Sequence, residues 1–466
     1  MGFHLYRIVS VSNAIKKGVF PVRIYEERFN YYGYGSPLFY CDFFLYVPAF
    51  IHNFFHLDYT VCWKIFIFII NVLTFINAYI SFKLISSSAE IGLLASVLYS
   101  LSTYRLVDIY TRAAIGECCA LAFIPFVLCG FEMLRKKEYK HWLLLAAGYT
   151  GVLLSHMLSF LMMILFGAVY CLLHIKEFLN KDAIASISKA AILSVGCTAW
   201  FLVPLISAMS LPIQARQDYP DFCRTSLSFS ELFDFPLYGA ASPEIYKGLL
   251  PTNTGYGITK TSGVLLLIGS IVFLIVLLKD RKEETRKHTG KGLLLAGWII
   301  IVLMSDLMPW QILQDLPVFS FFRSFQFVWR FNMLVILVLS LCAAYGFSYI
   351  IKKKRALVIL IAVLVLVFSA LFYKTYIPQS RQYTDDNMPL LTDELYLFVG
   401  NDIATRPMYE SNWDSLIVNT LPSNRGLAFD FSVKPSASSQ PLYIDVPLNY
   451  YPGYIASVDG DPADVT

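Results

Sequence analysis

About ten stretches of apolar residues, most of them near the length that crosses a lipid bilayer, constrain this 466-residue chain more than any other feature. Because a bilayer interior offers no water to backbone N–H and C=O groups, such stretches must form helices there. The sequence therefore predicts an α-helical polytopic membrane protein with about ten spans. These stretches cover residues 59–83, 88–104, 116–134, 141–156, 159–174, 188–208, 263–279, 292–306, 331–351 and 356–373.

Composition agrees with a membrane location and excludes several classes of function. Hydrophobic residues make up 57% of the chain and charged residues 15%, whereas a soluble domain carries about 25% charged residues. The net charge of +4 is too small to indicate a nucleic-acid partner. Motifs for zinc, dinucleotide or P-loop phosphate binding are absent from the sequence, so no resident metal or cofactor is assigned from motifs.

Basic residues are concentrated in four short breaks between the apolar stretches, at 135–140, 176–181, 279–291 and 352–355. Short basic loops stay in the cytoplasm, and alternating spans place all four on one side. Residues 1–58, the loop 209–262 and the tail 374–466 are then expected outside a bacterial cytoplasmic membrane. A start outside the membrane implies either a missing upstream span, which we favour, or a segment 36–54 that dips into the bilayer.

Three regions follow from this topology. Residues 1–58 form an outer loop that opens with an amphipathic helix, expected to end near Gly18 and to lie along the outer surface, followed by an aromatic, Gly-rich segment. Residues 59–373 form the transmembrane domain. Residues 374–466 contain several prolines and alternating runs such as 442–446, which predict an extracytoplasmic β-rich domain without an obvious closing strand, and therefore a truncated one.

Ionisable residues cluster at the expected outer ends of the spans. Such groups are costly at membrane depth and often indicate function, so we expect several of them to line one cavity. Snorkelling side chains and helix-end ion pairs are the alternative for each residue taken alone. The residues are Arg105, Asp108, Arg112, Glu117, His156, Arg323 and Arg330.

Several short runs, in this order along the chain, resemble YfhO-like bacterial membrane proteins, a group that overlaps with proteins labelled 6-pyruvoyl-tetrahydropterin synthase-related. That label does not imply pterin chemistry. The runs are His4-Leu5-Tyr6-Arg7-Ile8, Gly18 to Ile24, Tyr32 to Tyr40, Tyr110-Thr111-Arg112 with Gly116-Glu117, Leu154-Ser155-His156, Gln326 to Arg330, and Asn449 to Tyr454.

The resemblance implies a fold like that of GT-C glycosyltransferases, which move a sugar from a polyprenyl-phosphate carrier to an acceptor on the outer face. Family members carry a further span and an acidic pair just before the His-Leu-x-Arg stretch. This sequence begins Met1-Gly2-Phe3-His4, so both are missing. That departure would explain the expected exterior start. It also implies that the start codon is assigned too late or that the chain is a fragment. The resemblance then implies an enzyme that is impaired or inactive in this form.

Site residues follow from the same resemblance. Arg112 and Arg330 are the expected ligands of the donor phosphate, because a guanidinium group can bind two of its oxygens. The acceptor's proton would go to Glu117 or Asp42, the carboxylates that remain. Some GT-C enzymes use a divalent metal, and nothing in the sequence fixes one. The other candidates for substrate binding are His4, Arg7, Arg23, Tyr34, His156 and Gln326.

Two other functions fit the same pattern of residues. An outer cavity with cations would also suit a transporter or flippase of lipid-linked cell-envelope precursors. A non-catalytic membrane scaffold could present the β-rich tail to partners, although buried arginines and glutamates would then have little purpose. For the enzyme, the expected partners are a polyprenyl-phosphate-linked sugar, membrane lipid and a cell-envelope glycan acceptor, with no nucleic acid.

Overall fold

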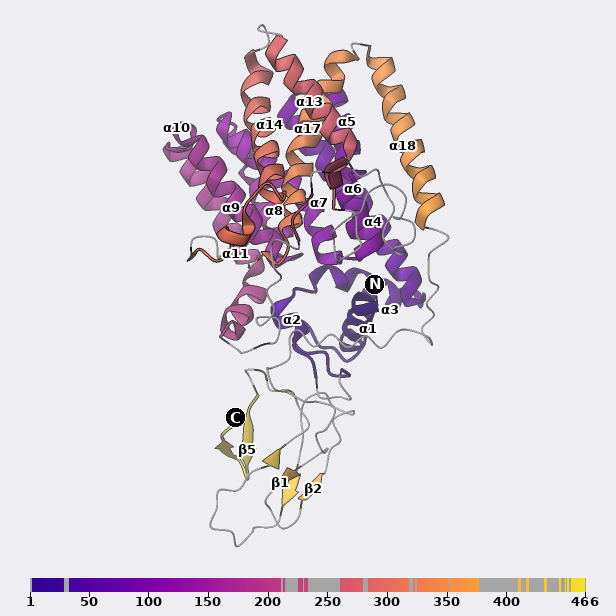
Figure 1. Ribbon diagram of the computed structural model, residues 1–466. Coiled ribbons are helices and arrows are strands. Elements are labelled where there is room, and N and C mark those ends of the chain that lie inside the picture. The colour runs from indigo at the N-terminus through magenta and orange to yellow at the C-terminus, as the bar shows by residue number, and fades with distance from the viewer. Residues whose placement is uncertain are drawn as a thin grey trace. The chain divides into compact units, whose positions relative to one another are not determined.

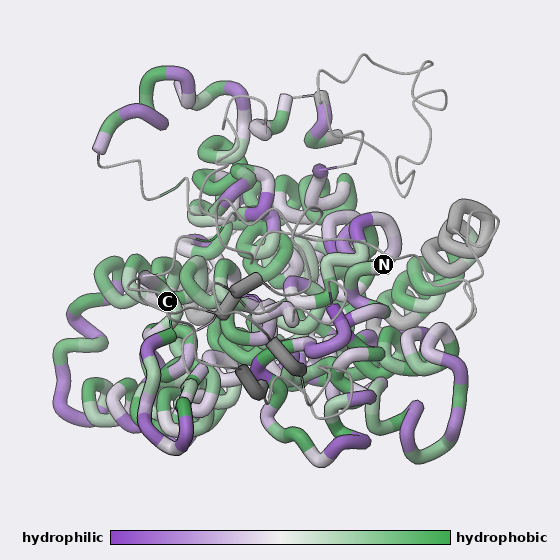
Figure 2. Tube along the Cα trace, turned by 90° about the horizontal axis from the view of Figure 1, so that it is seen from below, coloured by the Kyte–Doolittle hydropathy of each residue, from purple (hydrophilic) through white to green (hydrophobic). Residues whose placement is uncertain are grey.

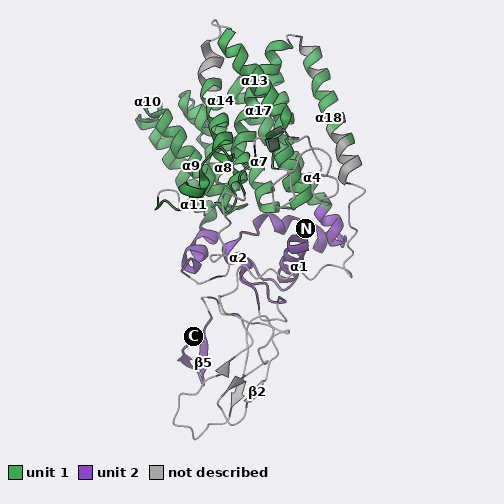
Figure 3. Ribbon diagram, viewed as in Figure 1, with its two compact units in different colours: residues 1, 64–198, 219–382 green, residues 2–63, 199–218, 383–466 purple. Residues whose placement is uncertain are grey.

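The computed structural model divides the chain into two compact units, shown in Figure 3. Unit 1 comprises Met1, Lys64–Thr198 and Tyr219–Gln382, and unit 2 comprises Gly2–Trp63, Ala199–Asp218 and Tyr383–Thr466. The structure describes residues 2–28, 33–210, 213, 225–228, 230–233, 260–279, 284–317, 322, 325–351, 353–376, 410–411, 416–418, 431–433, 444–445, 449, 451 and 454–465. Arg323, one of the predicted site residues, falls beyond this described part.

Long helices make up unit 1 (Figure 1), and a helix forms within each apolar stretch that the sequence singled out. Short helical segments join them, among them α6 (Thr103–Val107), η2 (Asp108–Arg112), α10 (Ile175–Phe178), η5 (Ser230–Phe233), α15 (Trp310–Leu313) and η8 (Val328–Phe331). The long helices are α4 (Tyr59–Ser86, which begins in unit 2), α5 (Ala89–Ser100), α7 (Ile115–Arg135), α8 (Trp142–Leu153), α9 (Met157–Leu173), α11 (Lys181–Ala208, which ends in unit 2), α13 (Val264–Lys279), α14 (Glu284–Met304), α17 (Asn332–Ile350) and α18 (Lys354–Tyr376).

Four helical segments among the described residues are long and apolar enough to cross a membrane. Figure 2 shows hydrophobic residues along the helices and hydrophilic residues at many of the connections. The chain is thus a helical membrane protein, as the sequence predicted, while the number of ten spans stays a prediction. The four segments are α4, α7, α11 and the continuous helical run Val328–Ile350.

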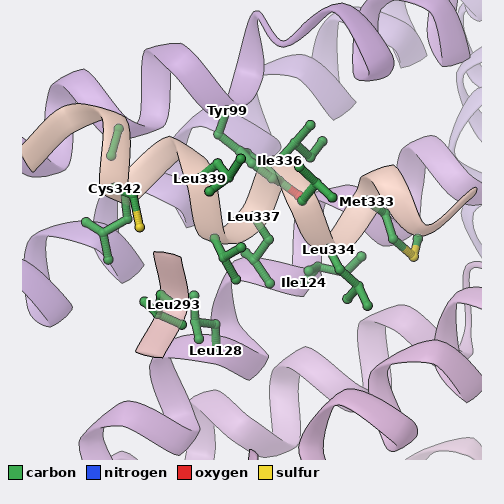
Figure 4. Close-up of a cluster of buried hydrophobic side chains, with 14 of the residues drawn as sticks. Tyr99, Ile124, Leu128, Leu293, Met333, Leu334, Ile336, Leu337, Leu339 and Cys342 are labelled. Carbon is green, nitrogen blue, oxygen red and sulfur yellow. The ribbon is translucent and has the colours of Figure 1, made fainter. Parts of the chain in front are cut away.

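Helix α17 forms the centre of unit 1. Its residues from Asn332 to Gly346 are all buried, and it packs against α13, α14 and α5. Figure 4 shows Leu334, Leu337 and Leu339 of this helix among side chains from neighbouring helices. Lipid chains are as apolar as leucine, so close packing rather than water exclusion has to hold such helices together.

Small residues allow that close packing between α13 and α17. A Cβ atom added at Gly269 would collide with Ala343, and one added at Gly346 would collide with the backbone of Gly269 and Phe273. The two helices therefore meet backbone to backbone, which increases the number of van der Waals contacts.

The N-terminal part of unit 2 contains α1 (Gly2–Lys16), α2 (Ser36–Phe39), η1 (Phe43–Leu45) and α3 (Tyr46–Phe55). The first helix stops where the sequence predicted, because Gly18 adopts a left-handed conformation with φ of 77°. Its placement differs from the prediction. Leu5, Ile8 and Val11 are fully buried, so α1 is an internal helix of unit 2 rather than a surface helix.

The C-terminal part of unit 2 contains short antiparallel strand pairs among its described residues. β1 (Glu410–Ser411) pairs with β4 (Ile444–Asp445), β2 (Leu416–Val418) with β3 (Phe431–Val433), and β5 (Ala456–Val458) with β6 (Asp461–Ala463). Strand β4 lies within the predicted run 442–446. The β5–β6 hairpin turns at Asp459 and Gly460, both with positive φ, a pair that favours a tight hairpin turn.

Candidate functional site: two buried clusters of charge

A buried cluster in unit 1 is centred on Glu117, at the first turn of α7. We call Tyr104, Asp108, Arg112, Glu117, Trp329 and Arg330 the Glu117 cluster. The Tyr104 hydroxyl donates a hydrogen bond to Oε1 of Glu117. The other carboxylate oxygen of Glu117, Oε2, lies 3.4 Å from Nη1 of Arg112 and 3.3 Å from Nε of Arg330. Two arginines far apart in the sequence therefore share one carboxylate.

Local backbone geometry brings Arg112 to this position. Residues Asp108–Arg112 form a π-helical turn, a form that is frequent at functional sites. Ala113 ends the turn in a left-handed conformation with φ of 51°, and α7 begins two residues later. Nη1 of Arg112 forms an ion pair with Oδ1 of Asp108, the first residue of the same turn. The side chain of Arg112 thus reaches carboxylates on both sides of this bend.

Arg330 is positioned by a second bend. Gln326 has a left-handed backbone with φ of 65°, a conformation that costs a non-glycine residue about 1 kcal/mol or more. Nη1 of Arg330 donates to the Phe325 carbonyl oxygen at 3.1 Å and to Oε1 of Gln326 at 3.0 Å. Gln326, predicted to bind substrate, therefore contacts the guanidinium group that is expected to bind phosphate.

Aromatic rings complete the cluster. The Arg112 guanidinium lies 4.3 Å from the centre of the Trp329 ring. The Tyr104 and Trp329 rings pack edge to face, with their centroids 6.2 Å apart. A guanidinium over an indole face gains a cation–π attraction that grows when water is excluded. Tyr104 and Trp329 were not predicted from the sequence. Neutral aromatic residues are abundant in this chain, and no spacing distinguished these two.

Two arginines face two carboxylates in the Glu117 cluster, so the formal charges of these four side chains cancel. Asp108 is fully buried and Glu117 is 1% exposed, whereas the Arg112 side chain is 14% exposed. Within the described residues, Oδ2 of Asp108 has no hydrogen-bond partner. Most buried polar atoms are paired, so this carboxylate retains capacity to accept a proton or a hydrogen bond.

His156 belongs to the same region of unit 1. It caps the N-terminus of α9, where its Nδ1 accepts from the Ser159 N–H at 3.3 Å. The imidazole also interacts electrostatically with Glu117, Arg112 and Arg330, so it lies near the Glu117 cluster. Its capping role explains its position locally, and its ring remains next to the predicted phosphate ligands.

A second cluster lies within unit 2, and we call Arg7, Tyr25 and Asp42 the Asp42 cluster. All three side chains are 1% exposed. Nε of Arg7 donates to the Tyr25 hydroxyl at 3.3 Å, and that hydroxyl donates to Oδ2 of Asp42 at 3.3 Å. Nη2 of Arg7 donates to the backbone carbonyl oxygens of Tyr40 and Cys41 at 2.9 and 3.3 Å. Arg7 thus holds the segment that leads into Asp42.

The Asp42 carboxyl is unusually easy to protonate. Burial raises its pKa to about 6, against the opposing attraction of the Arg7 and Arg23 guanidinium groups. Burial likewise raises the pKa of the Tyr25 hydroxyl well above its usual range, so Tyr25 stays a neutral donor. A carboxyl that titrates near neutral pH is suited to accepting a proton during a reaction.

The remaining predicted residues of unit 2 are held by aromatic and backbone contacts. The His4 ring stacks on Trp63 with centroids 6.2 Å apart. Nη2 of Arg23 donates to the Trp200 carbonyl oxygen at 2.5 Å. Tyr34 is buried and pairs through its backbone with Tyr25.

Residues near the C-terminus pack on the aromatic, Gly-rich segment of unit 2. Nδ2 of Asn449 donates to the Gly33 carbonyl oxygen at 2.6 Å, and a Cβ atom at Gly35 would collide with the Tyr451 ring. The glycines of the aromatic segment therefore serve close packing between sequence-distant parts of unit 2.

The predicted site residues fall into two groups. Glu117, Arg112, His156, Gln326 and Arg330 gather in unit 1, whereas His4, Arg7, Arg23, Tyr34 and Asp42 are in unit 2. Arg105 has its own partners on α4, since it donates to Asn71 at 2.8 Å and Thr74 at 3.0 Å. Across the described residues, no three His, Cys, Asp or Glu side chains are arranged to hold a metal ion.

Comparison with known proteins adds little about function. No family model matches the chain. An uncharacterized protein of Lactococcus lactis subsp. cremoris (strain MG1363) is 25% identical over 214 residues, which is 44% of this chain and 34% of the relative. The match thus spans about a third of the relative's length, and the relative's name assigns no activity.

Proposed function

We propose that the chain is a GT-C-type membrane glycosyltransferase related to the YfhO-like proteins. It would transfer a sugar from a polyprenyl-phosphate carrier to a cell-envelope acceptor at the outer face of a bacterial cytoplasmic membrane. The observation that supports this most directly is the convergence of Arg112 and Arg330 on Glu117 inside a helical membrane protein. The proposal includes about ten spans and an external C-terminal region.

The phosphate of the donor is the group that the two arginines would bind. Guanidinium forks match phosphate oxygens in geometry and charge. Arg112 is the more accessible of the two, at 14% exposed against 6% for Arg330. Before donor binding, Glu117 and Asp108 keep both cations neutralised and in place, which lowers the cost of holding them in a buried position.

The reaction forms a bond between the acceptor oxygen and the anomeric carbon of the sugar. The bond from that carbon to the phosphate oxygen breaks, and its electron pair stays on the polyprenyl phosphate. Arginines stabilise the charge that develops on this leaving group. The acceptor hydroxyl loses its proton to a carboxylate, and general base catalysis of this kind contributes roughly 10²–10⁴-fold.

Two carboxylates are candidates for the base, and their contacts differ. Glu117 is occupied by two guanidinium groups and the Tyr104 hydroxyl. Asp42 accepts a hydrogen bond from Tyr25, and burial raises the pKa of its carboxyl to about 6, which is near neutral pH. Glu117 is therefore the residue that positions the arginines within unit 1, and Asp42 of unit 2 is kept as the other candidate for the base.

The test is a transfer assay with radiolabelled undecaprenyl-phosphate sugars and the full-length protein in membranes. Arg112→Ala and Arg330→Ala should each abolish transfer. Arg135→Ala is a matched control, because Arg135 pairs with Glu132 at 2.9 Å and its side chain is 13% exposed, nearly as for Arg112. Wild-type turnover in both cluster variants, or equal loss in the control, would contradict the proposal.

Transport of lipid-linked precursors is the second candidate, and the charge balance of the Glu117 cluster favours it. Because each arginine already has a carboxylate beside it, a substrate phosphate can be bound by exchange with Glu117 and Asp108, provided that each displaced carboxylate takes up a proton so that no buried charge is left unpaired. A flippase would move a fluorescent lipid-linked sugar across the membrane of proteoliposomes without breaking its glycosidic bond. An enzyme would release polyprenyl phosphate in the same vesicles.

A further inference from the structure

Helix α3 of unit 2 exposes apolar side chains on one side. Val47, Phe50 and Phe54 are 36, 52 and 78% exposed, and Phe43 just before the helix is 42% exposed. Their positions follow an i, i+4, i+7, i+11 spacing, which places them along one stripe of a helix. We call these four residues the phenylalanine stripe.

The opposite side of α3 is fixed to the interior of unit 2. Tyr46 and Ala49 are buried there. Two hydrogen bonds join Asn53 to Ser12 of α1, from Ser12 Oγ to Asn53 Oδ1 at 2.6 Å and from Asn53 Nδ2 to the Ser12 carbonyl oxygen at 3.1 Å. The rotation of the helix is therefore set by the fold. Val47, Phe50 and Phe54 face away from the interior of unit 2, while Phe43 is partly exposed and also lies beside Trp200, with ring centroids 6.3 Å apart. In water, such a patch would be costly and prone to aggregation.

The chain connection places α3 close to the end of a membrane span. Only residues 56–58 separate α3 from α4, which is long and apolar enough to cross a membrane. The four residue steps from Phe55 to Tyr59 span at most about 14 Å when the chain is fully extended. The junction is also fixed, since the His52 ring stacks on Tyr59 with centroids 3.8 Å apart and Nδ1 of His52 lies 2.8 Å from the Leu57 carbonyl oxygen. Helix α3 is thus held close to the first residues of α4.

We propose that α3 is an in-plane membrane anchor, and that the phenylalanine stripe inserts into the acyl region of the leaflet that contains the start of α4. The partner is the acyl chains rather than anionic headgroups, because residues 43–57 contain no Lys, Arg, Asp or Glu. Interfacial helices that depend on anionic lipid carry basic residues on their polar side.

A consequence concerns Asp42, which directly precedes the stripe. Anchoring of Phe43 and α3 sets the depth of the Asp42 cluster at the lipid boundary. This inference does not depend on the proposed enzymatic activity. The same anchor would serve a transporter or a scaffold.

The test is photo-crosslinking of the full-length protein in nanodiscs that contain radiolabelled phosphatidylcholine. The photoreactive residue p-benzoylphenylalanine replaces Phe50 or Phe54, one at a time. Phe68 of α4, which is 67% exposed within a candidate span, serves as the lipid-facing reference. Ser457, on the exposed β5 strand, serves as the polar-surface reference. Variants are compared only where they elute as a single species, and Phe50 and Phe54 are independent probes of one stripe.

Lipid label attached at positions 50 and 54 should approach the level at position 68, and high salt should leave it unchanged. Label no higher than at position 457 would overturn the proposal. Loss of the label in high salt would overturn acyl chains as the partner, because headgroup attraction is screened whereas apolar insertion is not. Crosslinking to a protein in place of lipid would also overturn it.

Discussion

The Glu117 and Asp42 clusters both bury arginine with carboxylate, but they pair them in different ways. Arg112 and Arg330 contact Glu117 directly, so each buried charge has an opposite charge beside it. Arg7 reaches Asp42 through the Tyr25 hydroxyl and gives its other donors to backbone carbonyl oxygens. Direct pairing holds charge in place, whereas pairing through a neutral hydroxyl leaves the carboxyl free to titrate. The first arrangement suits binding an anion, and the second suits handling a proton.

The largest expected effect comes from removing the shared carboxylate. Glu117→Gln leaves two buried arginines with less compensation, and breaking a buried ion pair in this way costs about 3–5 kcal/mol. Thermal unfolding in detergent measures the loss. Glu132→Gln is the control, because Glu132 pairs with a single arginine, Arg135. Equal losses of stability in the two variants would show that a carboxylate shared by two arginines stabilises the fold no more than a carboxylate paired with one.

Asp42 should make stability depend on pH. Its pKa is about 6 in the folded chain against an ordinary 3.8, so the folded state binds the proton more tightly. The stabilisation is therefore complete below about pH 3.8 and is lost as pH rises through about 6, a change of about 3 kcal/mol. Asp42→Asn should flatten the unfolding profile across this window. If stability falls with pH as steeply in Asp42→Asn as in the wild type, Asp42 is excluded as the source of the pH dependence.

Tyr25→Phe tests the neutral link in the Asp42 cluster. Without the hydroxyl, the ionised carboxylate loses a hydrogen bond worth about 1 kcal/mol, so the pKa of Asp42 should rise by less than one unit. The midpoint of the pH-dependent loss of stability should move upward accordingly. Tyr34→Phe is a comparison variant, since Tyr34 joins Tyr25 through backbone atoms. A downward shift in Tyr25→Phe would contradict the assigned direction of the hydrogen bond.

Trp329→Phe should have the smallest effect. Phenylalanine keeps a ring beneath the Arg112 guanidinium but offers a weaker cation–π attraction, so the expected loss is about 0.5–1 kcal/mol. Unfolding in detergent again measures it, together with the apparent affinity for the donor phosphate. A loss as large as that of Glu117→Gln would mean that the aromatic contact, rather than the ion pairs, holds the Glu117 cluster together.

Much of the helical architecture could be predicted because it depends on local properties. The apolar runs that became α7 and α17 are visible in the sequence, and Gly18 marks the end of α1. The burial of α1 could not be predicted, because a helical pattern does not distinguish a lipid surface from the interior of unit 2. The same holds for α3, whose stripe lies in a largely apolar segment interrupted by His52 and Asn53.

The candidate sites were predictable only in part. Ionisable residues at the ends of spans identified Arg112, Glu117, His156 and Arg330 before their contacts were known, because charge is rare in such a chain. Tyr104 and Trp329 could not be found in this way, since they are neutral aromatic residues among many. The contact between Tyr25 and Asp42 depends on how the loop of unit 2 folds back, which no sequence spacing reveals.

Unit 2 is discontinuous along the chain, with pieces from residues 2–63, 199–218 and 383–466. The hydrogen bond from Asn449 to Gly33 and the fit of Tyr451 over Gly35 join its first and last pieces. During synthesis, a ribosome must therefore deliver the intervening helices to the bilayer before this unit can close. The early segment that carries Asp42 has to wait, incompletely packed, until translation reaches its C-terminal partners.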